Sequence, residues 1–126
     1  MSWGKAKIDR ADKLFSLYVR TKANWSCERC GKQYQPPTSA LHCSHFKGRA
    51  KESTRFMLEN ANAICFGCHR YFTSQPDEHY AWQIETKGQK IVDQVILTGS
   101  LYKKKDRKLE AMYWKQRLLE DFGIKG

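Results

Sequence analysis

Two pairs of cysteines constrain the fold of this chain more than any other feature. Cys27 and Cys30 are separated by two residues, as are Cys65 and Cys68, and 34 residues lie between the two pairs. A turn of this spacing directs two sulfur atoms at one ion, and four thiolates complete the tetrahedral shell of Zn²⁺ with no position left for water. We therefore expect a structural zinc ion, with residues 31–64 projecting from the base that it holds. Redox-active or free thiols are the alternative, and they would need two independent motifs of this kind.

The charge of the chain narrows the class of its partner. The net charge is +10, and residues 1–50 contain ten Lys and Arg against three Asp and Glu. This balance favours a negatively charged partner, either nucleic acid or an acidic membrane surface. Alternatively, the charges are solvated surface residues without a binding role. No apolar run is long enough to cross a bilayer, and the first residues have no apolar signal-peptide core. We therefore expect a cytoplasmic protein that binds nucleic acid and not membrane.

The apolar pattern predicts a single α+β domain over residues 1–126, with a core at about 25–75. A helix is expected at 9–23, because apolar residues recur there with helical spacing and Asp9 can act as N-cap. Strands are expected at 41–46 and 54–58, joined into a hairpin by the basic turn 47–51. Cys43 in the first strand is expected to be a small buried residue. A helix should open at Cys65, and C-terminal helices are expected within about 77–122: from Pro76 to Gly88, from 89 to 97, and from 107 to 122.

Three polar residues stand at fixed offsets from the cysteines. His45 lies in the first expected strand, Asn60 precedes the second cysteine pair by five residues, and His69 directly follows that pair. Successive side chains of a helix point about 100° apart, so His69 should point away from the zinc. We expect His45 and His69 to face each other across a shallow cleft. A lone histidine is more often a surface or core residue, and the fixed offsets favour the functional interpretation here.

This arrangement suits the hydrolysis of a phosphodiester bond. A neutral imidazole, with a pKa of about 6.5, can take a proton from water at physiological pH. A divalent ion can hold a phosphate oxygen and stabilise the leaving 3′ oxygen. Arg49 and Arg55 can bind flanking phosphates through two hydrogen bonds each.

The order of these motifs resembles the HNH nuclease family, of the treble-clef, ββα-metal class. The residues that carry the likeness are the two cysteine pairs, the segment Cys43-Ser44-His45-Phe46-Lys47-Gly48-Arg49, the segment Thr54-Arg55-Phe56, Asn60 and His69. The chain is most similar to phage recombination nucleases of the NinG/Rap type, which also open with a helix like residues 12–20. The likeness runs from about Asp12 to Gly88, and the tail beyond Gly99 is outside it.

The resemblance implies a role for each matching residue. His45 would be the general base, Asn60 would orient the hairpin or His45, and His69 would bind a catalytic Mg²⁺ or Mn²⁺. Ser44 stands where many members carry an aspartate or histidine as second metal ligand. A serine hydroxyl is a poor ligand, so His42, two residues earlier, is an alternative.

The expected function is therefore metal-dependent cleavage of DNA, in a phage or bacterial setting. Family analogy alone extends this to branched recombination intermediates. The expected DNA contacts are basic residues on one face of the first helix and in the hairpin: Arg10, Lys13, Arg20, Lys47, Arg49, Lys51 and Arg55. A non-catalytic zinc module that binds nucleic acid would explain the charge and the paired cysteines equally well, but not the placement of His45, Asn60 and His69. A restriction or homing nuclease is a further alternative. The oligomeric state stays open, with a homodimer among the options.

Overall fold

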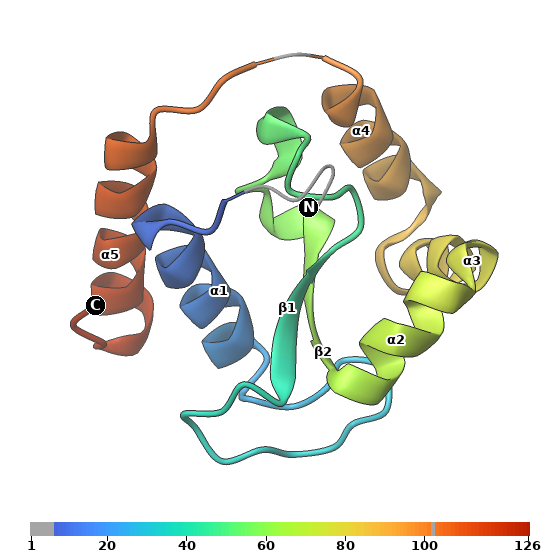
Figure 1. The fold of residues 1–126 in the computed structure, drawn as a ribbon, viewed down its shortest axis with the longest axis horizontal. Helices are drawn as coiled ribbons and strands as arrows, with labels where there is room; N and C mark the ends of the chain where they lie inside the picture. Colours follow the sequence, from blue (N-terminus) through green and yellow to red (C-terminus); the bar gives the residue numbers. More distant parts are fainter. Residues whose placement is uncertain (1–6, 102) are drawn as a thin grey trace.

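The computed structural model describes residues 7–101 and 103–126. It has a small central hairpin between two groups of helices (Figure 1), with α1 and α5 on one side and α2, α3 and α4 on the other. The elements are α1 (Arg10–Lys22), β1 (Leu41–His45), η1 (Glu52–Thr54), η2 (Leu58–Asn60), β2 (Ala61–Cys65), α2 (Phe66–Ser74), α3 (Pro76–Lys87), α4 (Gln89–Gly99) and α5 (Arg107–Phe122), where η denotes a 3₁₀ helix. The α+β expectation is confirmed.

The hairpin pairs β1 with β2 in an antiparallel register, with Leu41 opposite Cys65 and His45 opposite Ala61. The second strand was expected at 54–58, and that prediction is wrong, because this segment forms turns between η1 and η2. All five residues of β2 are buried. A strand covered on both faces lacks the polar–apolar alternation by which strands are recognised in a sequence, which is why this one was missed.

The first helix begins and packs as its sequence predicts. The side chain of Asp9 accepts a hydrogen bond from the backbone N–H of Asp12 at 3.1 Å, and the side chain of Asp12 accepts one from the backbone N–H of Asp9 at 3.0 Å. This reciprocal capping box satisfies two of the N–H groups that a helix leaves without intrahelical partners at its start. The expected apolar stripe is buried, and it meets α5, where the Phe15 and Trp114 rings lie 4.9 Å apart.

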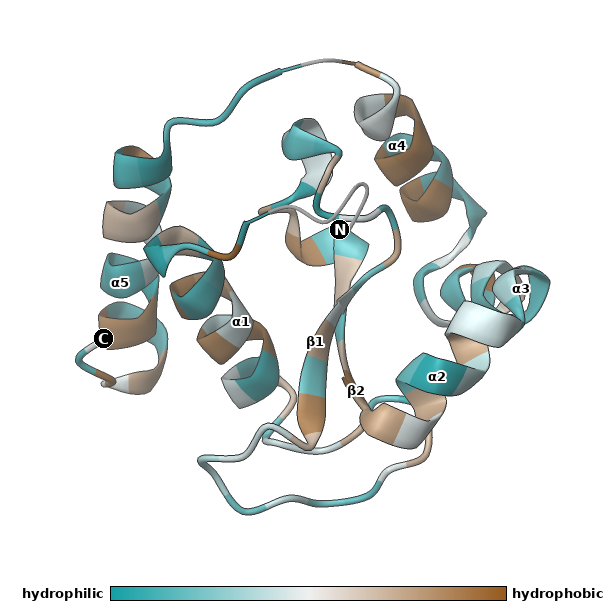
Figure 2. Ribbon diagram, viewed as in Figure 1, coloured by the Kyte–Doolittle hydropathy of each residue, from teal (hydrophilic) through white to brown (hydrophobic). Residues whose placement is uncertain are grey.

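The remaining helices follow the predicted boundaries closely. α3 opens at Pro76 and stops at Gly88, whose φ of 90° is a conformation that favours glycine. The apolar stretch of α4 (Figure 2) buries Val92 and Val95 and packs on η1 and η2. Asp106 caps the start of α5 through its side chain. Across residues 7–101 and 103–126, no helix combines the length and the apolar character that a bilayer-spanning segment needs.

Candidate metal centre and active site

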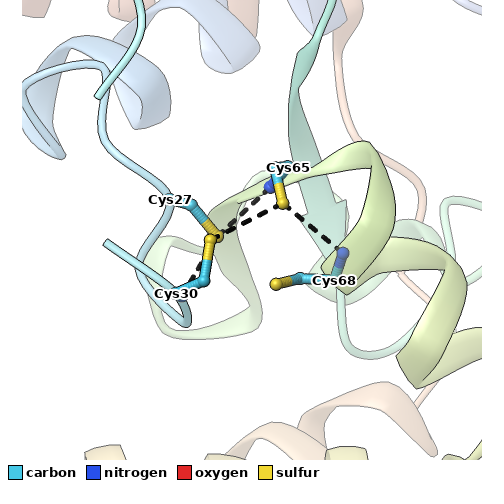
Figure 3. A group of neighbouring side chains, drawn as sticks. All are labelled: Cys27, Cys30, Cys65 and Cys68. Atoms are coloured by element: carbon cyan, nitrogen blue, oxygen red, sulfur yellow. Dashed lines mark hydrogen bonds between the residues drawn. The ribbon is translucent and has the colours of Figure 1, made fainter. Parts of the chain in front are cut away.

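The four paired cysteines meet at the lower end of the hairpin, as Figure 3 shows. Cys27 and Cys30 come from the turn after α1, Cys65 ends β2, and Cys68 lies in the first turn of α2. Their sulfur atoms all lie within 4.8 Å of one another, and the Sγ atoms of Cys30 and Cys65 are 3.8 Å apart. Zn–S bonds of about 2.3 Å in a tetrahedron place two sulfurs about 3.8 Å apart. The geometry therefore suits zinc.

Hydrogen-bond donors reach two sulfurs of the cluster, those of Cys27 and Cys68. The Cys27 sulfur accepts hydrogen bonds from the backbone N–H groups of Cys30 at 3.4 Å and of Cys65 at 3.3 Å. Arg29 donates to the sulfur of Cys68 at 3.4 Å. Donors aimed at sulfur stabilise the negative charge that metal binding requires. The residues present thus fit a structural zinc ion, which would hold α2 to the turn after α1.

The fifth cysteine does not belong to this cluster. Cys43 lies on β1 with 7% of its surface exposed, as expected for a small core residue. Burial raises the pKa of its thiol to about 12. The thiol therefore stays protonated at physiological pH and is neither a ligand nor a nucleophile there.

A second pair of ligand-type side chains lies beside the cysteine cluster, since His69 directly follows Cys68 and His42 follows the residue that pairs with Cys65. The Nδ1 atoms of His42 on β1 and His69 on α2 are 2.9 Å apart, so one donates a hydrogen bond to the other. The two rings border a cavity of about 420 Å³, which Phe66, Arg70 and Thr73 also line. Burial, followed by the charge of His42, lowers the pKa of His69. Two imidazoles that converge at a cavity are able to hold a metal ion together.

His45 is held in one tautomer by the backbone. Its Nε2 lies 2.9 Å from the carbonyl oxygen of Arg55, which can only accept, so Nε2 donates and Nδ1 carries the lone pair. Burial, and then the positive charge of Arg49, lowers the pKa of His45 to about 4. The ring is therefore neutral at physiological pH. Within the described part of the chain, the buried Nδ1 has no hydrogen-bond partner, and neither has the buried Nε of Arg49.

The expectation that His45 faces His69 is wrong. The ring of His45 packs beside Phe15 of α1, with centroids 5.7 Å apart, whereas His42 packs beside His69 of α2. Neighbouring residues of a strand point to opposite faces, so residues 42 and 45 must diverge. The side chain that meets His69 is thus the alternative ligand, His42. Ser44 shares the His42 face but is almost fully buried, opposite Asn62.

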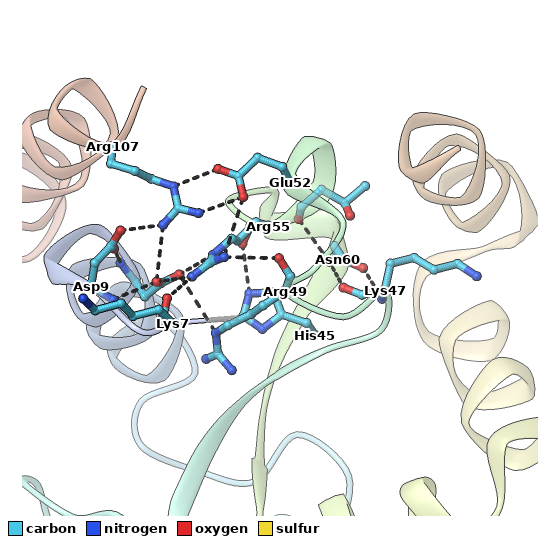
Figure 4. A network of polar contacts seen from close by, with 11 residues as sticks. Lys7, Asp9, His45, Lys47, Arg49, Glu52, Arg55, Asn60 and Arg107 are labelled. Carbon is cyan, nitrogen blue, oxygen red and sulfur yellow. Dashed lines mark hydrogen bonds and ion pairs between the residues drawn. The ribbon is translucent and has the colours of Figure 1, made fainter. Parts of the chain in front are cut away.

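Asn60 closes the loop between the strands, at the top of the hairpin (Figure 4). Its Oδ1 accepts from the backbone N–H of Lys47 at 2.7 Å, and its Nδ2 donates to the carbonyls of Lys47 at 2.9 Å and Thr54 at 3.0 Å. The side chain is fully buried, and all of these bonds are to backbone atoms. Asn60 therefore fixes the loop that carries Arg55, and through it the carbonyl that holds His45.

Two of the expected DNA contacts are structural residues instead. Arg55 is 3% exposed and forms an ion pair with Asp12, so its guanidinium does not reach a ligand in solvent. Arg20 is half-buried, lies over the Trp25 ring and donates to the carbonyl of Thr38 at 3.0 Å. The other expected contacts keep at least part of their side chains in solvent: Arg10, Lys13, Lys47, Arg49 and Lys51.

Asp12 has a role that the sequence interpretation did not assign, whereas His79 was expected to be structural or exposed and is a packing residue. Asp12 is buried at 3% exposure and accepts from Arg55, and its only signal in the sequence is an acid three residues after the N-cap. His79 stacks on Phe72 with centroids 4.5 Å apart and lies 2.9 Å from the Gln83 amide. Burial lowers the pKa of His79 to about 4, and its contacts are those of a packing residue.

Comparison with models of known protein families, with curated proteins and with solved structures finds no match. The molecule is an α+β protein in which four cysteines, positioned to bind a metal such as zinc, bring the turn after α1 to the junction of β2 and α2.

Proposed function

We propose that this protein is a metal-dependent DNA endonuclease of the HNH type, with a treble-clef core held by zinc. The observation that carries the proposal is the pair His42 and His69, whose Nδ1 atoms converge at 2.9 Å beside an open cavity and next to the cysteine cluster. A divalent ion held by this pair would stabilise charge on the phosphate and on the leaving 3′ oxygen. Imidazole suits Zn, Fe, Ni and Cu better than either expected ion, and of those two the transition metal Mn²⁺ accepts nitrogen ligands more readily than Mg²⁺.

His45 supplies the general base in this proposal. Its Nε2 is fixed on the Arg55 carbonyl, and its low pKa keeps the Nδ1 lone pair free at physiological pH. Nδ1 accepts a proton from water as the water oxygen attacks phosphorus, and the bond from phosphorus to the 3′ oxygen breaks. Arg49 acts on His45 through its charge, and its Nε lies 4.0 Å from Oδ1 of Asp12 but has no hydrogen-bond partner among the described residues, so in this proposal it donates to a phosphate oxygen or to the attacking water.

The DNA backbone is bound by basic side chains around the same end of the hairpin. Lys47, Arg49 and Lys51 lie in the loop after β1, and Arg10 and Lys13 lie in the first turns of α1. Phosphate contacts of this kind position the backbone without reading the base sequence. A branched recombination intermediate, in a phage or bacterial setting, is the substrate that the family resemblance favours.

Nicking of a supercoiled plasmid tests the proposal. Wild-type protein should nick in Mn²⁺ and, at higher concentration, in Mg²⁺, and should stop in EDTA while elemental analysis shows the cysteine-bound zinc still in place. His45→Ala should lower the nicking rate by about 10²- to 10⁴-fold, the usual contribution of a general base, with DNA affinity unchanged. His42→Ala and His69→Ala should each raise the concentration of Mn²⁺ required.

A matched control uses the fourth histidine. His79→Gln removes an imidazole outside the cavity and should nick like the wild type. Absence of metal-dependent nicking in the wild type, or a wild-type rate in His45→Ala, would overturn the assignment.

One observation favours a second candidate, a zinc-stabilised module that binds nucleic acid without cutting it. His45 lies on the α1 face of β1 and its Nδ1 is buried, so the chain holds the base and the His42–His69 pair apart. A pure binding module would show salt-dependent DNA affinity, no nicking in any divalent metal, and no effect of His45→Ala on binding.

A further inference from the structure

The guanidinium of Arg55 is bound on every side within the protein. Its Nε donates to Oδ1 of Asp12 at 2.8 Å and its Nη2 to Oδ2 of Asp12 at 2.5 Å. Nη2 also donates to the carbonyl of Lys7 at 2.6 Å, and Nη1 to the carbonyl of Arg49 at 3.3 Å. The side chains of Asp12 and Arg55 are 2% and 3% exposed. A two-point contact between planar groups fixes orientation as well as distance.

The backbone of the same residue holds His45. The carbonyl of Arg55 accepts from Nε2 of His45 at 2.9 Å, while the preceding carbonyl, of Thr54, accepts from Asn60. Two consecutive carbonyls, of Thr54 and Arg55, are thus each held by a side chain from another segment. Because the guanidinium is bound to α1, the peptide after Arg55 has little freedom to rotate. The direction of its carbonyl sets which nitrogen of His45 bears the proton.

The network of contacts around Arg55 continues to the last helix, α5. Arg107 of α5 donates from Nε and Nη2 to the two oxygens of Glu52, at 2.8 and 2.7 Å, and from Nη1 to Asp9 at 2.5 Å. Glu52 also lies 3.6 Å from the guanidinium of Arg55. Figure 4 shows this chain of contacts running from α5, through the loop, to His45. Helix α5 lies outside the hairpin and α2, yet it supports the position of His45.

Stability alone is a weak explanation for this buried pair. Removing two charges from water is costly, and apolar residues of similar volume often stabilise a fold equally well. What a bidentate ion pair adds is a fixed geometry, and here the fixed backbone leads directly to His45. We propose that Asp12 and Arg55, supported by Glu52 and Arg107, are positioning residues that lock His45 in its Nε2–H tautomer with Nδ1 free to accept a proton. This inference rests on the proposed function only in giving His45 the role of base.

The test reads the tautomer of His45 directly from the ¹⁵N chemical shifts of its ring, and nicking in parallel. Wild-type His45 should show the Nε2–H form alone. In Arg55→Lys, which keeps the charge but not the two-point contact, both tautomers should be populated. The kcat for nicking should fall by about 10- to 100-fold, as for lost support of a catalytic group, with KM for DNA unchanged.

Milder variants keep the proposal testable where Arg55→Lys does not fold. Arg107→Gln and Glu52→Gln remove partners whose side chains are 31% and 16% exposed, and they should give the same change to a smaller degree, which Arg107→Lys should partly restore. Arg117→Gln is the matched control, since it breaks an ion pair with Asp121 elsewhere on α5. It should leave tautomer and kcat unchanged.

Three results overturn the inference: a single Nε2–H tautomer in the folded variants, a mixed tautomer with full kcat, or an equal effect of Arg117→Gln. A wild type that never nicks contradicts the proposed function instead. The tautomer measurement would then still decide whether the pair fixes the ring.

Discussion

Replacing Asn60 by alanine removes the side chain that closes the loop between the strands. This residue is 0% exposed and makes three hydrogen bonds of 2.7, 2.9 and 3.0 Å, all to backbone atoms of residues 47 and 54. None of these backbone groups gains a substitute partner from a methyl group. The change therefore removes three hydrogen bonds. One backbone N–H and two carbonyls are left without a protein partner, and they either bond to water that enters the site or stay unpaired.

The expected cost follows from that count. A net contribution of about 1 to 1.5 kcal/mol for each hydrogen bond gives a loss of about 3 to 5 kcal/mol in the free energy of unfolding. Domains are typically stable by about 5 to 15 kcal/mol, so the variant should remain folded at low temperature with zinc bound. Asn62→Ala is the control. That amide bonds to the side chains of Glu28, Gln83 and Lys87. Glu28 is exposed and Lys87 is partly exposed, so both can turn toward water, and only the buried Gln83 loses a partner that water does not replace. Its loss should cost about 1 to 2 kcal/mol.

Urea unfolding followed by tryptophan fluorescence, in excess zinc, measures both differences. Hydrogen exchange adds a local test, because the Lys47 amide donates to Asn60 and should lose its protection only in Asn60→Ala. Nicking should be lost in that variant and kept in Asn62→Ala. The reasoning is refuted if Asn60→Ala costs less than Asn62→Ala, or if the Lys47 amide exchanges at the wild-type rate.

Three further predictions concern metal, pH and salt. Cys68→Ser should leave the protein without zinc and unfolded by circular dichroism, because binding of a structural zinc supplies about 10 to 16 kcal/mol of folding free energy; a folded, zinc-free Cys68→Ser protein would contradict this. His45 and His79 have pKa values lowered to about 4, so the unfolded chain binds more protons between about pH 6.5 and 4, and stability should be full above pH 6.5 and fall as the pH drops. Urea midpoints at pH 7 and 5 check this, and equal midpoints would refute it. In DNA binding, Lys51→Ala should reduce the slope of log K against log salt by about 0.9, whereas Arg20→Ala, which removes an internally bound side chain, should not; equal changes would show that exposure is the wrong criterion.

The helices were predictable because their signals are local. Asp9 before an apolar stripe, Pro76 at a helix start and Gly88 after a helix end each act within a turn of their own position. The second strand was not, because its assignment depends on coverage by other elements. The segment Ala-Asn-Ala-Ile-Cys has no alternation, and only the packing of α1 and α2 against its two faces makes it a strand.

The residues of the candidate site were also predictable only where their signals are local. The four cysteines were predictable, since their spacing is a local property of two turns and a shared ion. The wrong partner for His69 came from the face of β1 on which His45 lies, which depends on a register the sequence does not show. Arg55 was taken for a surface residue because its partner, Asp12, lies 43 positions away. A basic residue in a basic turn gives no sign of burial until the tertiary contact is known.

The separation of His45 from the His42–His69 pair does not by itself prevent them from acting on one substrate. Among the described residues β1 pairs with β2 alone, so its other edge has no ladder partner. Side chains from both faces of an edge strand border that unpaired edge, which a strand inside a larger sheet would not allow. His42 and His45 are three residues apart, about 10 Å along the strand.

A phosphodiester backbone laid along the unpaired edge of β1 would therefore meet the His42–His69 pair first and His45 next. It would then meet the loop that carries Lys47, Arg49 and Lys51. Nδ1 of His45 is buried, so it must open toward that path when DNA binds. The Arg49 side chain acts on His45, is 30% exposed and pairs with Asp12 only at 4.0 Å, which makes it the neighbouring group best placed to move. The proposed nuclease function thus calls for a local movement of Arg49 on DNA binding, while Asp12, Arg55 and Asn60 stay fixed behind His45.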